Sequence, residues 1–226
     1  MKFRHEHKFL IEYDTYLSLK NALTKVMQLD QNSIKNEGYH IRSLYFDDVY
    51  DNALYEKLSG ISERQKFRVR IYNYSDKRIK LEVKKKYQDY TNKIGTTITK
   101  EEYTKLFQCD VEDFAFSDNL VKRNYYLEVR NNLLKPKVIV DYYREAYVLP
   151  YNEIRLTFDK QLSAANPCMN IFTDKITTKN LPKEYSRILE VKYNNFLPTH
   201  IKTILEQYNL TRLSVSKYLL CRNIIQ

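Results

Sequence analysis

Apolar and charged residues alternate along much of this chain with a period of two residues. In the segment 64–72 the apolar positions include Phe67, Val69 and Ile71, and lysine or arginine occupies most positions between them. This is the period of a β-strand whose two faces differ in polarity. The pattern predicts strands over residues 3–11, 39–47, 64–72, 79–86, 137–147, 153–160 and 187–193.

Helices are predicted between these strands. Asp14 is a suitable N-cap for a helix that carries Leu17 and Leu23, and Thr99 with Glu102 forms a capping box. Further helices are predicted over 119–131, 199–208 and 214–224, and a long loop over 166–181. Strands and helices do not alternate regularly, which argues against a doubly wound parallel sheet. The pattern favours an α+β fold: an antiparallel sheet of about eight strands that closes into a β-barrel, with helices packed outside.

Composition supports one folded unit. The chain has 226 residues with only 3 Gly and 5 Pro, so no flexible linker divides it, and we expect a single domain over 1–226. Its 3 Cys are widely spaced, which argues against a disulfide framework. It contains no apolar run long enough to span a bilayer and no signal-peptide core, so we expect a cytoplasmic protein without a transmembrane segment.

Charge changes this picture, because six of the predicted strands carry a charged face. The net charge is +10, which favours an anionic partner. For one strand, a solvated face is the simpler interpretation. Like charges opposite each other destabilise a sheet, however, so a sheet this basic is better explained if a polyanion neutralises it. The charged faces are Glu6 and Lys8; Arg64, Lys66, Arg68 and Arg70; Lys80, Glu82, Lys84 and Lys86; Tyr142 and Arg144; Glu153, Arg155, Thr157 and Asp159; and Glu190 and Lys192.

In a closed barrel of about eight strands, alternate residues point into the lumen. The charged faces would then line a polar tunnel of phosphate size, where arginine makes bidentate contacts and lysine supplies point charges. Carboxylates among these cations indicate a divalent metal ion, Mg²⁺ or Mn²⁺. Glu190 is the main candidate ligand, and Glu6 and Glu82 are weaker ones.

Short motifs spread over nearly the whole chain resemble, in order, the VTC-type polyphosphate polymerase domain of the triphosphate tunnel metalloenzymes. Each motif is weak alone, and the ordered set is more specific. The motifs are Arg4-His5-Glu6-His7-Lys8-Phe9, Ser43-Leu44-Tyr45-Phe46-Asp47, Lys66-Phe67-Arg68-Val69-Arg70-Ile71-Tyr72, Leu81-Glu82-Val83-Lys84, Asp141-Tyr142-Tyr143-Arg144, Ile154-Arg155, Leu189-Glu190-Val191-Lys192 and Ser214-Val215-Ser216-Lys217-Tyr218.

The resemblance implies an eight-stranded antiparallel tunnel that transfers the γ-phosphoryl group of ATP to polyphosphate with Mn²⁺ or Mg²⁺. It implies a metal ligand at Glu190 and a phosphate site completed by Tyr142, Ser216 and Lys217, with Lys93 near the tunnel mouth. The phosphate-binding residues it implies are Lys8, Arg68, Arg70, Lys84, Arg144 and Arg155. We also expect substrate contacts from Lys66, Lys86 and Lys192 on the same charged faces. Ser214 and Lys86 depart from the family pattern, which leaves the substrate preference open.

Two other functions remain open at this point. The same tunnel could pass the phosphoryl group to water, as a tripolyphosphatase or nucleoside triphosphatase does. A non-enzymatic polyanion or nucleic-acid binder would also be basic and rich in tyrosine. Glutamates inside the basic faces would repel a nucleic-acid backbone in the absence of metal, so we expect ATP or another nucleoside triphosphate and polyphosphate as partners, and no nucleic acid.

Overall fold

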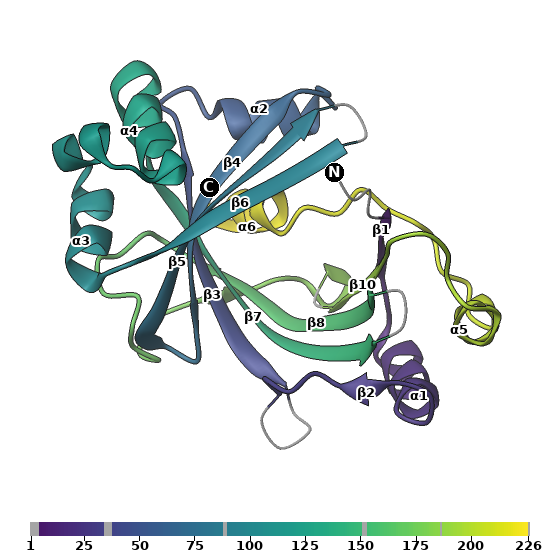
Figure 1. The fold of residues 1–226 in the computed structure, drawn as a ribbon. Coiled ribbons are helices and arrows are strands. Elements are labelled where there is room, and N and C mark those ends of the chain that lie inside the picture. The colour runs from purple at the N-terminus through teal and green to yellow at the C-terminus, as the bar shows by residue number, and fades with distance from the viewer. Residues whose placement is uncertain (1–4, 34–37, 88–89, 151–152, 186, 226) are drawn as a thin grey trace. The chain divides into compact units, whose positions relative to one another are not determined.

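An antiparallel sheet organises the fold. A computed structural model of the protein describes residues 5–33, 38–87, 90–150, 153–185 and 187–225. Eight strands are hydrogen-bonded in the order β1-β10-β8-β7-β3-β4-β5-β6, and the short strands β2 and β9 pair with β7 and β8 (Figure 1). The α+β class and the eight principal strands are confirmed. Within the described residues the hydrogen-bonded path is open, with β1 and β6 at its ends.

The predicted strands all occur, most of them slightly longer or shorter than expected. The strands are β1 (His5–Leu10), β2 (Gln28–Leu29), β3 (Tyr39–Asp47), β4 (Arg64–Tyr72), β5 (Ser75–Tyr87), β6 (Tyr90–Ile98), β7 (Lys135–Leu149), β8 (Ile154–Ala165), β9 (Lys179–Asn180) and β10 (Arg187–Tyr193). The helices are α1 (Tyr13–Leu23), α2 (Asn52–Leu58), α3 (Lys100–Gln108), α4 (Leu120–Asn132), α5 (Thr199–Glu206) and α6 (Lys217–Ile225), with 3₁₀ turns at Glu112–Phe116 and Lys183–Tyr185. None of the helices in the described part of the chain is long and apolar enough to cross a membrane.

The chain forms two compact units, and β3 and β7 each pass from one unit into the other. The first unit comprises Met1–His40, Tyr142–Ser163 and Asn180–Lys217, and the second comprises Ile41–Asp141, Ala164–Lys179 and Tyr218–Gln226.

The core of the first unit lies between its strands and the helices α1 and α5. Phe158 and Leu189 point to this side of the sheet, where they meet Leu19 of α1 and Ile201 of α5. Burying an apolar side chain of this size contributes about 1.5–3 kcal/mol. The alternating residues of β1, β8 and β10 therefore turn to the opposite face, and these are the charged residues.

The second unit has the same arrangement around β3, β4 and β5. Phe67 packs against Tyr125 of α4, with ring centroids 5.7 Å apart, and Tyr103 of α3 lies in the same core. The capping box that starts α3 is confirmed: the Glu102 N–H donates to Thr99, and the Glu102 carboxylate accepts from the Thr99 N–H. Apolar residues of β4 and β5 face these helices, which leaves the charged residues on the other face.

Some predicted helix starts were wrong. Helix α1 begins at Tyr13 with Glu12 at the N-cap position, so Asp14 lies in the first turn instead of capping it. Pro198, and not Thr199, occupies the N-cap position of α5, and α6 begins at Lys217. Polar side chains near a helix start are often equally plausible caps, and only the backbone geometry distinguishes them.

Besides the two-residue strands β2 and β9, the prediction missed strand β6 and helix α2, for different reasons. Strand β6 has few apolar residues, and its register joins it to β5 along one edge. Helix α2 is only seven residues long, and its N-terminal turn is capped from another element: the N–H groups of Ala53 and Leu54 donate to the Asp47 carboxylate at 2.9 and 3.1 Å. Neither a polar edge strand nor a tertiary cap leaves a local periodic signal.

Replacing Gly38 with alanine should destabilise the first unit strongly. Gly38 has φ +89°, and a Cβ at this position would lie 2.1 Å from the backbone oxygen of Arg144. Left-handed backbone alone costs about 1–2 kcal/mol for a residue with a side chain, and the clash adds to this. Urea denaturation should show a larger loss for Gly38→Ala than for Gly60→Ala, because Gly60 has φ +71° but open space around its Cβ position. Equal losses of stability in the two variants would mean that the backbone of β7 at Arg144 can move away from the added Cβ without a loss of stability.

Candidate functional site

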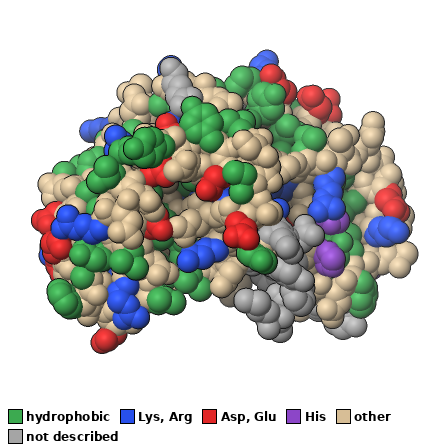
Figure 2. Space-filling view, turned by 90° about the horizontal axis from the view of Figure 1, so that it is seen from above, with side chains coloured by type: hydrophobic (Ala, Val, Ile, Leu, Met, Phe, Trp, Pro, Cys, Tyr) green, Lys and Arg blue, Asp and Glu red, His purple; other side chains and the backbone are tan. Residues whose placement is uncertain are grey.

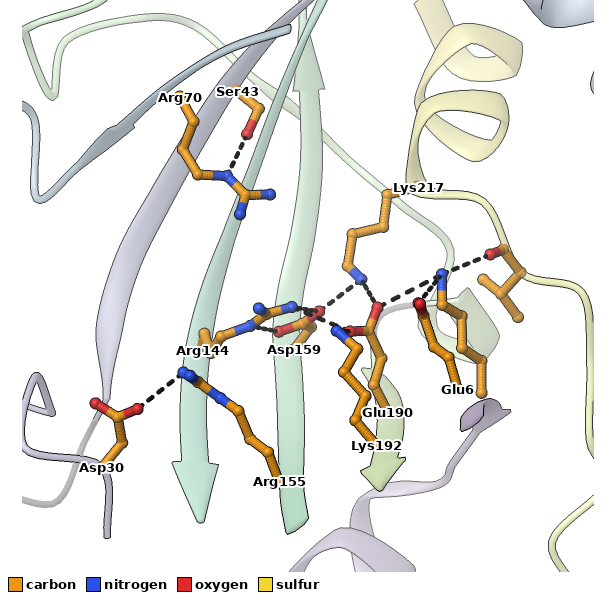
Figure 3. Close-up of polar contacts among 12 residues, drawn as sticks. Glu6, Asp30, Ser43, Arg70, Arg144, Arg155, Asp159, Glu190, Lys192 and Lys217 are labelled. Atoms are coloured by element: carbon orange, nitrogen blue, oxygen red, sulfur yellow. Dashed lines mark hydrogen bonds and ion pairs between the residues drawn. The ribbon is translucent and has the colours of Figure 1, made fainter. Parts of the chain in front are cut away.

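Glu190 is surrounded by four cations in the first unit (Figure 3). It lies on β10 and is only 4% exposed. Lys217 Nζ donates to its Oε1 at 3.0 Å and Lys192 Nζ to its Oε2 at 2.9 Å. Lys8 Nζ is 3.6 Å from Oε1 and Arg144 Nη2 is 3.4 Å from Oε2. One buried carboxylate thus gathers four of the residues that the sequence predicted to bind phosphate or substrate.

Strand register explains why these residues meet. On the charged face of the first unit, Lys8 of β1 lies opposite Glu190 of β10. Glu6 lies opposite Lys192, which in turn lies opposite Arg155 of β8. Cross-strand partners have Cβ atoms about 4.5–5.5 Å apart, so alternation along each strand becomes a lattice of charges across the sheet.

Asp159 is a second buried carboxylate in this group, to which the sequence assigned no role. It is 0% exposed. Arg144 donates to both of its oxygens, Nε to Oδ1 at 2.6 Å and Nη2 to Oδ2 at 2.7 Å, and Lys217 Nζ lies 2.5 Å from Oδ2. Both cations also lie over the ring of Tyr142, at 5.4 and 5.1 Å from its centroid. The alternation on β8 did place Asp159 on the charged face, but only the structure shows which cations it holds. We call Glu6, Lys8, Arg144, Asp159, Glu190, Lys192 and Lys217 the Glu190 cluster.

The charges in the Glu190 cluster stabilise one another. Burial opposes ionisation of Glu190, but Lys192, Lys217, Lys8 and Arg144 together hold its pKa well below the usual range. Burial likewise opposes the charge of Asp159, and Arg144 and Lys217 lower its pKa. Burial disfavours the Lys217 ammonium, yet Asp159 and Glu190 raise its pKa. Glu190, Asp159 and Lys217 are therefore ionised near neutral pH.

Arg155 makes its contacts beside this cluster. Its Nη2 lies 2.9 Å from Asp30 Oδ2 and donates to the Tyr39 hydroxyl at 3.1 Å. Its Nε is buried without a hydrogen-bond acceptor among the described residues. An orphaned guanidinium N–H is costly inside a protein, and an anionic ligand would satisfy it.

The second unit carries its own basic face, formed by Lys66, Arg68, Arg70, Lys80, Glu82, Lys84, Lys86 and Lys93. The register across β4, β5 and β6 gives the rows Lys66–Lys84–Lys93, Arg68–Glu82–Gly95 and Arg70–Lys80–Thr97. Three lysines in one row repel one another, which is the arrangement that an anion would stabilise.

Glu82 is the one carboxylate of this basic face. Arg68 Nε donates to it at 2.7 Å, and Lys93 also forms an ion pair with it. Burial raises the pKa of Glu82, but Arg68, Arg70 and Lys93 lower it to about 2. A Cβ on Gly95 would lie 3.1 Å from Glu82 Cγ, so glycine at position 95 leaves room for the Glu82 side chain.

Two of the three arginines of β4 are held by hydroxyl groups of β3. Arg68 Nη1 donates to the Tyr45 hydroxyl at 2.8 Å, and Arg70 Nε donates to Ser43 Oγ at 3.2 Å. Neutral hydroxyl partners orient a guanidinium without cancelling its charge, and Arg68 additionally donates to the Glu82 carboxylate.

Lys66 carries a buried ammonium group in the basic face. Its Nζ is buried without a hydrogen-bond acceptor among the described residues, and it lies 4.5 Å from the centroid of the Tyr218 ring. Burial lowers its pKa to about 7, although Asp47 and Glu56 attract the charge, while Arg64 and Lys57 repel it. Lys84 lies opposite it in the sheet.

Replacing Lys66 with methionine should stabilise the protein at low pH. Below pH 7 the folded state carries a buried ammonium, and its removal should raise the free energy of unfolding by about 1–2 kcal/mol. The unfolded-state pKa is near 10.5, so unfolding takes up a proton between pH 7 and 10.5, and the gain should shrink across this window and vanish above it. Urea denaturation at pH 6, 8 and 10 measures this difference. Lys202→Met, on the exposed side of α5, should show no such trend, and a pH-independent gain for Lys66→Met would contradict the prediction.

Basic side chains do not form one continuous patch on the surface that Figure 2 shows. Lys and Arg are scattered there among acidic and apolar side chains. The described site cations are instead partly buried: the side chains of Lys8, Lys192 and Lys217 are 23%, 24% and 10% exposed. Charge held in this way is screened less by salt than surface charge is.

A divalent metal ion fits the Glu190 cluster better than the basic face of the second unit. Lys8 Nζ lies 3.2 Å from Glu6 Oε1 and 3.6 Å from Glu190 Oε1, so both carboxylates already share one cation. Mg²⁺ is commonly bound by one or two carboxylates together with substrate phosphates. No group of three or more His, Cys, Asp or Glu side chains suited to a metal occurs among the described residues. The remaining ligands would therefore have to come from substrate or water.

A known sequence family covers nearly the whole chain. The sequence model of the VTC domain matches residues 3–225. The chain belongs to the VTC domain family. A comparison with curated proteins found no match. The resemblance read from the short motifs is therefore confirmed at the level of the family.

Solved structures share the fold of this VTC domain at low sequence identity. A putative adenylate cyclase from Vibrio parahaemolyticus is 13% identical, with a TM-score of 0.52 over 97% of this chain and 98% of that one. A putative adenylate cyclase from Bacillus halodurans is 12% identical, with a TM-score of 0.52 over 95% and 94%. A chain of the Schizosaccharomyces pombe Mediator head module is 9% identical, with a TM-score of 0.51 over 93% and 99%. These likenesses show the fold alone, and a fold does not by itself decide activity.

The remaining predicted residues of the VTC domain lie on β5 or directly before α6. Ser216 is half-buried and directly precedes Lys217, the first residue of α6, while Ser214 is exposed in the preceding segment. Lys84 and Lys86 are half-buried, and Lys86 lies opposite Arg64. The two positions that depart from the family pattern, Ser214 and Lys86, thus differ in burial, and the exposed serine is the less constrained of the two.

Proposed function

We propose that this VTC domain is a metal-dependent phosphotransferase that makes inorganic polyphosphate from the γ-phosphate of ATP. The observation that carries the proposal is the Glu190 cluster, in which Lys8, Arg144, Lys192 and Lys217 converge on one buried carboxylate. Cations gathered away from solvent are suited to a chain of phosphates, whose charge they match. Membership of the VTC domain family supports this assignment.

Phosphoryl transfer requires alignment and charge neutralisation rather than a protein nucleophile. The bond between the γ-phosphorus and the ADP oxygen breaks, and a terminal oxygen of polyphosphate forms the new bond to phosphorus. Arg144 and Lys217, both fixed on Asp159, would neutralise charge on the transferred group. Lys8 and Lys192, with longer contacts or greater exposure, would hold neighbouring phosphates.

Glu190 and Glu6 would hold a Mn²⁺ or Mg²⁺ ion, which would offset the negative charge of the phosphates when it is bound. Glu82 is a weaker candidate because Arg68 and Lys93 already neutralise it. The residues proposed to bind the nucleotide or polyphosphate chain elsewhere in the domain are Lys66, Arg68, Arg70, Lys84, Lys86, Lys93, Tyr142, Arg155 and Ser216.

Incubation with ATP and Mn²⁺ or Mg²⁺ tests the proposal directly. Phosphorus NMR should show ADP together with the internal phosphate signal of polyphosphate, and a chelator should abolish both. Release of free phosphate without polyphosphate would indicate a triphosphatase that uses water as acceptor. Binding of tripolyphosphate without any turnover would leave a polyanion-binding module and overturn the enzyme assignment.

A further inference from the structure

Asp159 is the most deeply buried acid of the Glu190 cluster. Its two partners, Arg144 of β7 and Lys217 of α6, also contact Glu190. We propose that Asp159 is a positioning residue that orients Arg144 and Lys217 toward a bound phosphate chain. The inference rests on the proposed function, because it names the residue that prepares the same site.

The geometry of Arg144 carries the first step. Its Nε and Nη2 both donate to the Asp159 carboxylate, and Nη2 also lies 3.4 Å from Glu190. Two parallel N–H···O bonds fix the plane of a guanidinium as well as its position. The third nitrogen, Nη1, donates to no group in the described part of the chain. The fork therefore holds one edge of the guanidinium on Asp159 and leaves Nη1 for a ligand.

Lys217 carries the second step. Its Nζ lies 2.5 Å from Asp159 Oδ2 and 3.0 Å from Glu190 Oε1, over the ring of Tyr142. A lysine side chain has four rotatable bonds, and an ammonium held between two carboxylates loses most of that freedom before substrate arrives. Without Asp159, both Lys217 and Arg144 would keep only Glu190 as a carboxylate partner. Because of Asp159, two of the four cations have a second carboxylate partner and do not depend on Glu190 alone.

A buried ion pair could also serve the fold alone, and the first unit contains a matched example. Glu145, the residue after Arg144 on β7, is also 0% exposed. It pairs with Lys160, with Lys20 at 3.1 Å and with the Tyr16 hydroxyl at 2.8 Å, on the face covered by α1. Losing one partner of a buried pair is strongly destabilising at either site, so stability alone does not separate the two roles.

The test compares Asp159→Asn with Glu145→Gln in the full chain. Asparagine keeps the size of the side chain but replaces one carboxylate oxygen with an NH₂ donor, so it cannot accept the two parallel N–H···O bonds of Arg144. Tripolyphosphate affinity, measured by calorimetry, should fall at least about tenfold in Asp159→Asn and by less than about twofold in Glu145→Gln, with similar losses of urea stability in both. In turnover, Asp159→Asn should lower kcat more than it raises KM, because orientation is used in the transition state.

Arg144→Lys provides a second variant if Asp159→Asn does not fold. It keeps the charge but removes the fork, and it should reproduce the loss of affinity. Wild-type affinity in both Asp159→Asn and Arg144→Lys, or equal losses in Asp159→Asn and Glu145→Gln, would overturn the positioning role while leaving the proposed function in place. Failure of the wild-type protein to bind tripolyphosphate would overturn both.

Discussion

Glu190→Gln should abolish metal-dependent turnover and lower the free energy of unfolding by about 3–5 kcal/mol. The carboxylate lies within 3.6 Å of the ammonium groups of Lys8, Lys192 and Lys217 and within 3.4 Å of Arg144 Nη2. Glutamine preserves the shape of the side chain but leaves these cations to repel one another around a neutral amide. It also removes the main proposed metal ligand, so activity with Mn²⁺ should fall at least about hundredfold, which corresponds to about 2.7 kcal/mol of lost transition-state stabilisation.

The two effects of Glu190→Gln can be separated by adding an anion. Tripolyphosphate should raise the melting temperature of the variant more than that of the wild-type protein, because it replaces the missing negative charge. Glu145→Gln is the control: it removes a buried carboxylate on the other face, and tripolyphosphate should not raise the melting temperature of this variant more than that of the wild-type protein. Undiminished turnover in Glu190→Gln would exclude Glu190 as the metal ligand. An unchanged free energy of unfolding would mean that the four cations do not repel one another appreciably when the carboxylate is removed.

The double variant Arg68→Ala/Arg70→Ala should bind tripolyphosphate at least about hundredfold more weakly than the wild-type protein. The two arginines are two residues apart on β4, about 7 Å along the strand, which suits successive phosphates of one chain. Their side chains are largely buried and are oriented by Tyr45 and Ser43. Charge-assisted hydrogen bonds contribute about 1.5–3 kcal/mol each, so losing two should reduce affinity by a factor of about 10² or more.

A surface variant with the same change of charge provides the comparison. Lys105 and Arg130 are exposed and pair with Asp113 and Glu112 on the helical side of the second unit. Lys105→Ala/Arg130→Ala should change tripolyphosphate affinity by less than about twofold at physiological salt, where surface charge is screened over about 8 Å. Lys20 of α1 is unsuitable as a control because its Nζ lies 3.1 Å from the buried carboxylate of Glu145. Similar small losses in both double variants would favour diffuse binding over a defined phosphate site.

The strand faces of this protein could be predicted from the sequence because alternation and burial are the same signal. Strand β10 has the predicted bounds, Arg187–Tyr193, and its apolar residues Leu189 and Val191 are buried, as the pattern requires. Polar segments do not carry this signal, and for that reason β6 was missed. Helix starts were harder to predict, since Asp14 and Glu12 are both chemically acceptable near the N-terminus of α1.

The charged residues of the site were predictable one strand at a time, but their grouping was not. Alternation shows that Glu190 and Lys192 share a face; it does not show that Lys8 lies opposite Glu190, because register depends on pairing between distant segments. Asp159 illustrates the limit. It was recognised as part of a charged face, yet its contacts to Arg144 and Lys217 depend on three elements far apart in the chain.

Strand β7 places adjacent residues in opposite environments: Arg144 joins the Glu190 cluster, and Glu145 lies under α1. Adding or deleting one residue upstream in this strand would exchange the two, bringing an acid among the cations and a guanidinium beneath the helix. A substitution changes one position, whereas a change of length inverts both faces at once. Descendants of this sequence can therefore vary the residues of β7 far more readily than they can vary their number.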